Sequence, residues 1–170
     1  HIGHGLDRVN PLDWGPLWDQ LQHLPEKQRK VVREEMQGRR LSLIQGLVSQ
    51  GANRALEPVE RNLIARAQRI ADAEINDRMV VISDLLKVLD DAPDELRRIA
   101  MSGDDDAKYN NRTQGVVDAL RMFEAGGPYG DLFDGQTTNP IRLDQPLCFD
   151  LSSLESDEAG GAGLERLAQQ

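Results

Sequence analysis

Several residue types are scarce in this sequence, and each shortage excludes a class of protein. Cys148 is the single cysteine, so the chain has no internal disulfide framework, and this usage fits a reducing cytoplasm. No run of about 18 apolar residues occurs, so we expect no membrane-spanning helix. Basic residues are also in deficit, because 20 Lys and Arg stand against 29 Asp and Glu. The net charge of −9 disfavours non-specific adhesion of the whole surface to nucleic acid or anionic lipid, although a local basic face is compatible with it.

The motifs of common catalytic sites are missing as well. The sequence has no Gly-x-x-x-x-Gly-Lys-Ser/Thr loop to hold a triphosphate and no Gly-x-Gly-x-x-Gly fingerprint. The histidines have no metal-ligand spacing with a cysteine, and Cys148 lies in an apolar run typical of a buried side chain rather than a nucleophile. We therefore predict no catalytic, cofactor-binding or metal-binding residue. A small hydrolase is disfavoured, because no nucleophile, base and orienting group can be assembled.

What the sequence does contain is a helical middle. Apolar residues recur at helical spacing in 26–51, from 57 or 58 to about 71, and from 106 toward the Gly126-Gly127-Pro128 breaker. Pro93, followed by Asp94 and Glu95, predicts a further short helix through Ala100. The acidic run Asp104-Asp105-Asp106 lacks the spacing of a calcium loop and predicts an N-cap for the helix that begins at 106. Residues 80–89 are ambiguous, since Val80 and Val81 favour a strand whereas the spacing of the following leucines favours a helix. We choose the helix.

These patterns predict a mainly α fold, a bundle of about four or five helices with a short C-terminal β element. A length of 170 residues suits one hydrophobic core. Residues 1–24 are expected to form an extended leading segment with a short helix, and residues 25–125 to form the bundle. Residues 126–170 are expected to form a loop, a short strand at Leu147 to Leu151 and a terminal turn. Because the chain begins at His1 without an initiator Met, we expect a piece of a larger protein.

Four arginines are the first candidates for a binding role. Arg54 lies in the turn before the second long helix, and Arg61, Arg66 and Arg69 are expected on the solvent side of that helix. A solvated helix face is one explanation. The other is contact with phosphate, of DNA or of a nucleotide bound to a neighbouring subunit, for which the guanidinium fork is well suited.

Trp14 and Trp18 are the second candidates, because the aromatic residues make up only 4% of the chain. Their i, i+4 spacing would put both rings on one face of a helix. That face could pack against the bundle, or it could be a surface for a partner or for stacking on nucleic acid.

Short motifs at both ends of the helical middle carry a resemblance to a known family. These motifs are Arg8-Val-Asn-Pro-Leu-Asp13, Arg54-Ala-Leu-Glu-Pro-Val-Glu60, Ile82-Ser-Asp-Leu-Leu86, Gly130-Asp-Leu-Phe-Asp-Gly-Gln-Thr-Thr138 and Phe149-Asp-Leu-Ser152. In this order they resemble the P-loop motor ATPases of conjugative DNA transfer and type IV secretion, especially actinobacterial-like ones. The resembling region is the helical insertion between the Walker A and Walker B motifs, and it spans most of the chain.

The resemblance implies a helical insertion domain that leaves and rejoins an ATPase core. It implies that the parent protein binds ATP and Mg, forms a homohexamer and works with secretion or conjugation machinery, in the cytoplasm or peripherally at the inner face of the cell membrane. DNA is a further partner that it suggests. Since the nucleotide-binding motifs are missing, we expect the isolated chain to be inactive as an ATPase.

A helical adaptor that stands alone and binds a protein partner is the alternative. It would use the face of Trp14 and Trp18 or the long first helix as its docking surface. The two hypotheses differ in the C-terminal strand, which an adaptor should satisfy within its own fold or with an identical copy. An insertion domain would leave that strand to pair with the rest of the ATPase.

Overall fold

The computed structural model describes residues 8–138, and this part of the chain is built from helices without strands. A short helix, α1, lies within residues 1–24, and five helices lie between 25 and 125, where about four or five were expected. One further helical turn, α7, was not predicted. The C-terminal β element and Cys148 lie outside the described residues. The helices are α1 (Leu17–Leu21), α2 (Glu26–Gly51), α3 (Pro58–Glu74), α4 (Ile82–Asp91), α5 (Asp94–Ile99), α6 (Asp106–Arg121) and α7 (Gly130–Phe133).

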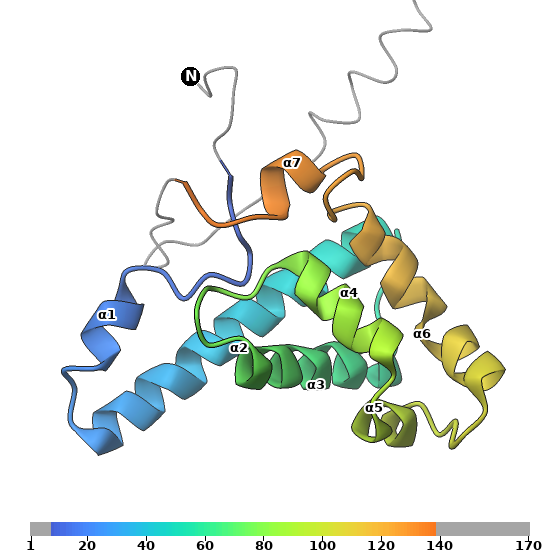
Figure 1. Ribbon diagram of the computed structural model, residues 1–170, viewed down its shortest axis with the longest axis horizontal. Helices are drawn as coiled ribbons and strands as arrows, with labels where there is room; N and C mark the ends of the chain where they lie inside the picture. Colours follow the sequence, from blue (N-terminus) through green and yellow to red (C-terminus); the bar gives the residue numbers. More distant parts are fainter. Residues whose placement is uncertain (1–7, 139–170) are drawn as a thin grey trace, which may run out of the picture.

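The long helix α2 is the central element of the fold. Helix α2 packs with α6 and α3, whereas its N-terminal half runs away from the other helices of the bundle and is accompanied by α1 (Figure 1). The turn of α7 lies above the bundle, next to the incoming segment of the chain (Figure 1). The turn begins at Gly130, and glycine is needed there because a Cβ would collide with the carbonyl oxygen of Glu124. None of the helices between residues 8 and 138 is long and apolar enough to cross a membrane.

Residues 80–89 contain both an extended piece and a helix, which explains why their sequence pattern is ambiguous. Val80 and Val81 are not helical, and Val80 is buried, while the helix begins at Ile82. The carboxylate of Asp84 accepts a hydrogen bond from the backbone N–H of Val81 (2.8 Å) and so satisfies a donor at the helix start. A short extended piece therefore leads directly into α4.

Helix α6 starts as expected and ends earlier than expected. The Asp105 side chain is its N-cap and accepts a hydrogen bond from the backbone N–H of Lys108 (2.9 Å), which confirms the capping role of the acidic run. The helix ends at Arg121, before the Gly126-Gly127-Pro128 breaker. The reason is that Phe123, which follows the helix, turns into the core and stacks on Tyr129.

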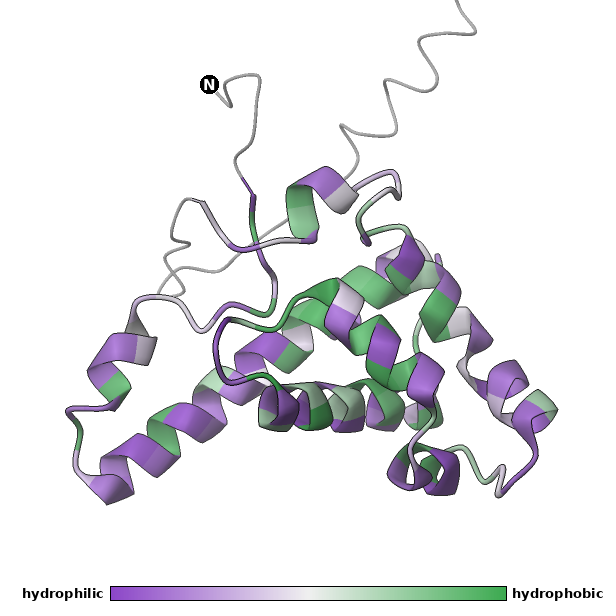
Figure 2. Ribbon diagram, viewed as in Figure 1, coloured by the Kyte–Doolittle hydropathy of each residue, from purple (hydrophilic) through white to green (hydrophobic). Residues whose placement is uncertain are grey.

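Within residues 8–138, the buried apolar side chains form two separate clusters. The main core contains side chains from each of the helices α2 through α7, such as Ile44, Leu63, Leu85, Leu120 and Phe133. The small core consists of Trp14, Leu21 and Met36, between α1 and the N-terminal half of α2. Figure 2 shows apolar colour on the inner faces of the bundle and mostly polar colour along the N-terminal half of α2.

Arg40 is the largest fully buried side chain in the part of the chain that the structure describes, and the sequence pattern did not predict its burial. Its two terminal nitrogens donate to the carboxylate oxygens of Asp72 in α3, at 2.9 Å each. Its Nε donates to the carbonyl oxygen of Leu12 at 2.6 Å, and its guanidinium lies over the ring of Trp14 at 4.5 Å. One charged side chain thus connects α2, α3 and the incoming segment.

Candidate functional site

The incoming and outgoing segments meet at one place, which we call the bracket junction (residues 8–10 and 132–138). The N–H of Arg8 donates to the Thr138 hydroxyl (2.8 Å), and the N–H of Thr138 donates back to the Arg8 carbonyl (3.1 Å). The N–H of Val9 donates to the Leu132 carbonyl (2.8 Å). The N–H of Asn10 donates to the Thr137 hydroxyl (3.1 Å). The two segments that carry the terminal motifs therefore lie side by side (Figure 1).

Side chains of the same motifs fix the bracket junction to the bundle. Asn10 is buried, donates to the carbonyl of Val80 (2.8 Å) and accepts from the N–H of Leu12 (3.0 Å). Gln136 donates to the carbonyl of Met79 (2.9 Å). A short amide-rich network thus ties both chain segments to the extended piece before α4.

Asp134 has the most connections in the outgoing motif. Its carboxylate accepts from the backbone N–H of Ser83 (3.1 Å), from the Ser83 hydroxyl and from the N–H of Ala125 (2.8 Å). The first turn of a helix leaves N–H groups without partners, and Asp134 satisfies one of them at the start of α4. The Asp134 side chain therefore links α4, the turn after α6 and the outgoing segment.

Arg54 is engaged in an ion pair. Its guanidinium holds the carboxylate of Glu60 by two hydrogen bonds (2.8 and 2.6 Å) and also donates to the carbonyl of Ala55 (3.1 Å). The hydrogen bond from Arg54 lowers the pKa of Glu60 below its ordinary value, although burial acts in the opposite direction. The first role of Arg54 is thus to neutralise a buried carboxylate at the start of α3.

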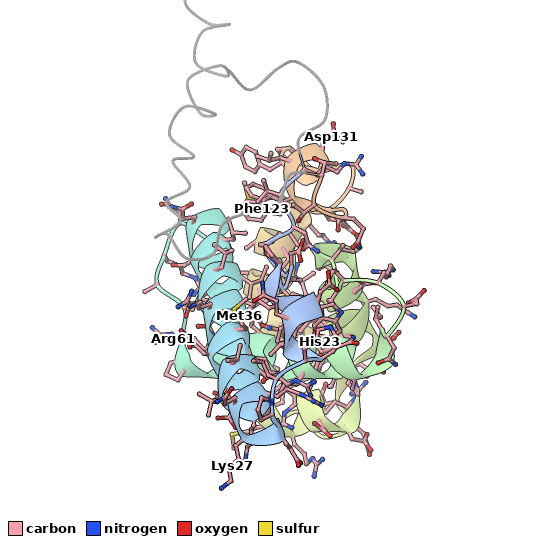
Figure 3. The ribbon with its side chains drawn as sticks, turned by 90° about the vertical axis from the view of Figure 1, so that its left-hand side faces the viewer. His23, Lys27, Met36, Arg61, Phe123 and Asp131 are labelled. Atoms are coloured by element: carbon pink, nitrogen blue, oxygen red, sulfur yellow. The ribbon has the colours of Figure 1, made fainter. Side chains whose placement is uncertain are left out.

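The three arginines of α3 are exposed, as predicted, but Arg61 and Arg66 do not share one face of the helix. Arg66 makes an ion pair with Glu95 of α5 (3.1 Å), and both side chains are about half exposed. Arg61 and Arg66 are five residues apart, which places them about 140° apart around a helix of 3.6 residues per turn. Figure 3 shows Arg61 at the outer side of the bundle, well apart from Asp131 of α7. A solvated face explains these exposed positions, and phosphate contact by them stays a prediction.

The two tryptophans are in contact, but they do not share a helix face. Trp14 precedes α1 and is buried, whereas Trp18 lies within α1 and is 36% exposed. Their ring centroids are 5.3 Å apart, with the rings tilted by 48°. Trp14 is a packing residue under Arg40. Trp18 covers it and keeps part of its ring in solvent.

A polar groove of about 460 Å³ lies where Arg54 faces α6. Sequence reasoning found Arg54 but missed its partners in the groove, because they come from a helix about fifty residues away. The i, i+4 spacing of Lys108 and Arg112 was the available signal, since it places both on one face of α6. The lining residues are Arg54, Glu57, Val59, Glu60, Lys108, Asn111, Arg112 and Gly115.

No group of three His, Cys, Asp or Glu side chains that could hold a metal ion occurs within residues 8–138. The bracket junction is a connection built from hydrogen bonds, and the groove is lined mainly by charged and amide side chains. Comparisons with protein-family models, with curated proteins and with solved structures find no match to this chain.

Proposed function

We propose that this chain is the helical insertion domain of a P-loop motor ATPase that powers conjugative DNA transfer or type IV secretion. The domain itself lacks nucleotide-binding motifs. The rest of the ATPase core would hold ATP and Mg, and the parent protein would act as a homohexamer at the inner face of the membrane. The single observation that carries the proposal is the bracket junction.

The bracket junction supports an insertion for a geometric reason. A domain inserted into a sheet-based core must leave and return at neighbouring points, because otherwise it would separate strands that pair in the core. Here Arg8 and Thr138, far apart in sequence, exchange hydrogen bonds. The segments that meet are also those whose motifs resemble the family.

The contacts around the junction are suited to transmitting movement. From inside the bundle, Arg40 donates a hydrogen bond to the carbonyl oxygen of Leu12. The Asp134 carboxylate accepts a hydrogen bond from the N–H of Ser83 at the start of α4. A rotation of the two connecting segments would therefore carry the bundle with it as a rigid body. Such a lever is a common way to convert nucleotide-driven closure into movement of a distant surface.

The test is to compare this chain with a longer protein that includes its natural flanking sequence. The isolated chain should release no phosphate from ATP above the blank, and the longer protein should hydrolyse ATP. The flanks should also encode a phosphate-binding loop before residue 1 and an acidic-ended hydrophobic strand after residue 170. Hydrolysis by the isolated chain, or flanks without these two elements, would overturn the proposal.

The adaptor alternative is supported by exposed apolar side chains near the small core. Trp18 is 36% exposed and Val31 is 63% exposed. The strand at Leu147 to Leu151, which would separate the two functions, lies outside the described residues. An adaptor would bind its partner equally well with and without the flanking sequence, so the same pair of proteins distinguishes the two functions.

A further inference from the structure

The groove between the start of α3 and the middle of α6 shares no residue with the bracket junction, so its role can be tested independently of the proposed function. Lys108, Asn111 and Arg112 are exposed on one face of α6 and line the groove together with Arg54. Cations from two separate elements thus face a single space.

The charges of the groove do not cancel. Arg54 and Glu60 neutralise each other through their paired hydrogen bonds. Lys108 and Arg112 then contribute +2 against −1 from Glu57, which leaves +1 on a chain whose net charge is −9. Among the described residues, neither Lys108 nor Arg112 makes a salt bridge that would neutralise it. The groove is therefore a local basic site on an acidic protein.

Arg54 acts in the groove as a fixed wall. A guanidinium has five N–H donors, and three of those of Arg54 are directed to Glu60 and Ala55. Swinging Arg54 toward a ligand would leave the buried Glu60 carboxylate without its cation, which is costly. Arg54 can instead offer its two remaining donors from where it stands, while Lys108 and Arg112 are free to close on a ligand.

Gly115 leaves room for the ion pair of Arg54 and Glu60 at the wall of the groove. A Cβ built on this residue would lie 2.7 Å from Nη2 of Arg54 and 3.1 Å from Oε1 of Glu60. Glycine is unfavourable in the middle of a helix, so its presence at this position of α6 needs a reason. The space left by the missing side chain accommodates the ion pair that forms the wall.

We propose that this groove binds a phosphate group. An arginine fork, a lysine and a side-chain amide are donors that match the oxygens of phosphate. Glu57 in the groove repels an extended polyanion, and the net charge of −9 on the chain acts in the same direction, so a compact ligand such as the phosphate chain of a nucleotide fits better than a long nucleic acid.

The experiment is an NMR titration of the full chain at low salt, with backbone amide shifts as the readout. The probes are sodium pyrophosphate, ATP and a single-stranded twelve-nucleotide DNA, used separately. Pyrophosphate and ATP should produce saturable shifts at residues 54–60 and 108–115. If only the DNA gives saturable shifts there, the phosphate comes from a nucleic acid backbone, and the preference for a compact ligand is wrong.

The double variant Lys108→Ala/Arg112→Ala should raise the Kd for pyrophosphate by about tenfold or more, since it removes two charge-assisted contacts. Glu57→Gln should lower the Kd, because it removes the repelling carboxylate. The matched control is Arg61→Ala/Arg69→Ala, which removes the same charge from α3 outside the groove and should leave the Kd unchanged. Equal weakening by both double variants, or no saturable shift in the groove with any probe, would overturn the proposal.

Discussion

The two halves of helix α2 differ in how they are held, although they belong to one continuous helix. The C-terminal half contributes Ile44, Leu47 and Val48 to the main core. The N-terminal half has no buried residue between Glu26 and Glu35, and Met36 is its apolar anchor in the small core. A helix that is polar nearly all round needs other support to be stable.

Part of that support is polar and comes from two arginines. Arg29 donates to the carbonyl of Leu24 (3.0 Å) and so holds the end of the loop after α1. Arg40, at the border between the halves, bonds Asp72 and Leu12. The main core therefore rests on the burial of apolar side chains, whereas the small core also depends on a few hydrogen bonds. When one of these hydrogen bonds is lost, no neighbouring contact replaces it.

The largest effect should come from the main core. Phe133 is fully buried and meets the ring of Phe123 edge to face, with centroids 5.6 Å apart. Phe133→Ala should lower the free energy of unfolding by about 3 to 5 kcal/mol, because a cavity remains beneath α7. Urea denaturation followed by circular dichroism measures this change.

Leu132→Ala is the matched control, since Leu132 is the neighbouring residue and is only partly buried. Its effect should be clearly smaller than that of Phe133→Ala. If both variants lowered the free energy of unfolding equally, α7 would not pack as part of the main core, and that core would end at Phe123.

The second effect tests the polar support of the small core. Arg40→Met keeps most of the side-chain volume but leaves Asp72 and the carbonyl of Leu12 without their donor. Breaking a buried pair from one side costs about 3 kcal/mol. Urea denaturation should show this loss, and the tryptophan fluorescence of the chain should change because the guanidinium no longer covers the ring of Trp14.

Arg39→Met provides the control one residue away. Arg39 pairs with Glu35 on the surface, where both side chains are about half exposed. Such a pair contributes about 0 to 1 kcal/mol. If Arg39→Met and Arg40→Met had the same effect, the buried pair would not support the small core.

Sequence reasoning located the helices because their signals are local. The Pro58 start, the Asp105 cap and the apolar stripe of α3 each depend on residues within a few positions of one another. The end of α6 was misplaced because Phe123 is withdrawn from the helix by a tertiary contact with Tyr129. That contact has no signal within the helix itself.

The candidate sites were harder to predict, for the same reason. The motif residues Asn10, Asp134 and Thr138 were singled out by resemblance, yet nothing in their spacing reveals that they hold two chain segments together. The burial of Arg40 depends on Asp72, which lies one helix away. Contacts between distant segments determine both the bracket junction and the groove.

The third prediction concerns how stability depends on pH. It should distinguish the ion pair of Arg54 and Glu60 from the ion pairs on the surface of the bundle. The pKa of Glu60 is below 4.5 in the folded chain because Arg54 bonds its carboxylate. The unfolded chain therefore takes up the proton first, so the stability that Glu60 provides is complete above about pH 4.5 and is lost as the pH falls through the folded pKa. Glu60→Gln should cost about 1 to 2 kcal/mol at pH 7.

The difference between wild type and Glu60→Gln should shrink when unfolding is measured at pH 3.5 instead of pH 7. Glu95→Gln, which alters the half-exposed pair with Arg66, should change stability little at either pH. A constant difference for Glu60→Gln across this range would mean that its proton is not linked to folding.

The smallest effect has the opposite sign and returns to helix α2. Gly38 lies in its polar half, and a Cβ added there would meet nothing within 4 Å. Gly38→Ala should therefore raise the free energy of unfolding by about 0.5 to 1 kcal/mol, since alanine loses less backbone entropy in a helix. Gly51, in the apolar half, is the control, because its added Cβ would lie 3.2 Å from Ala119 and Phe123. Gly51→Ala should gain less or lose stability. If both variants gained equally, helix propensity would limit the whole of α2, and the contrast between its polar and apolar halves would not govern its stability.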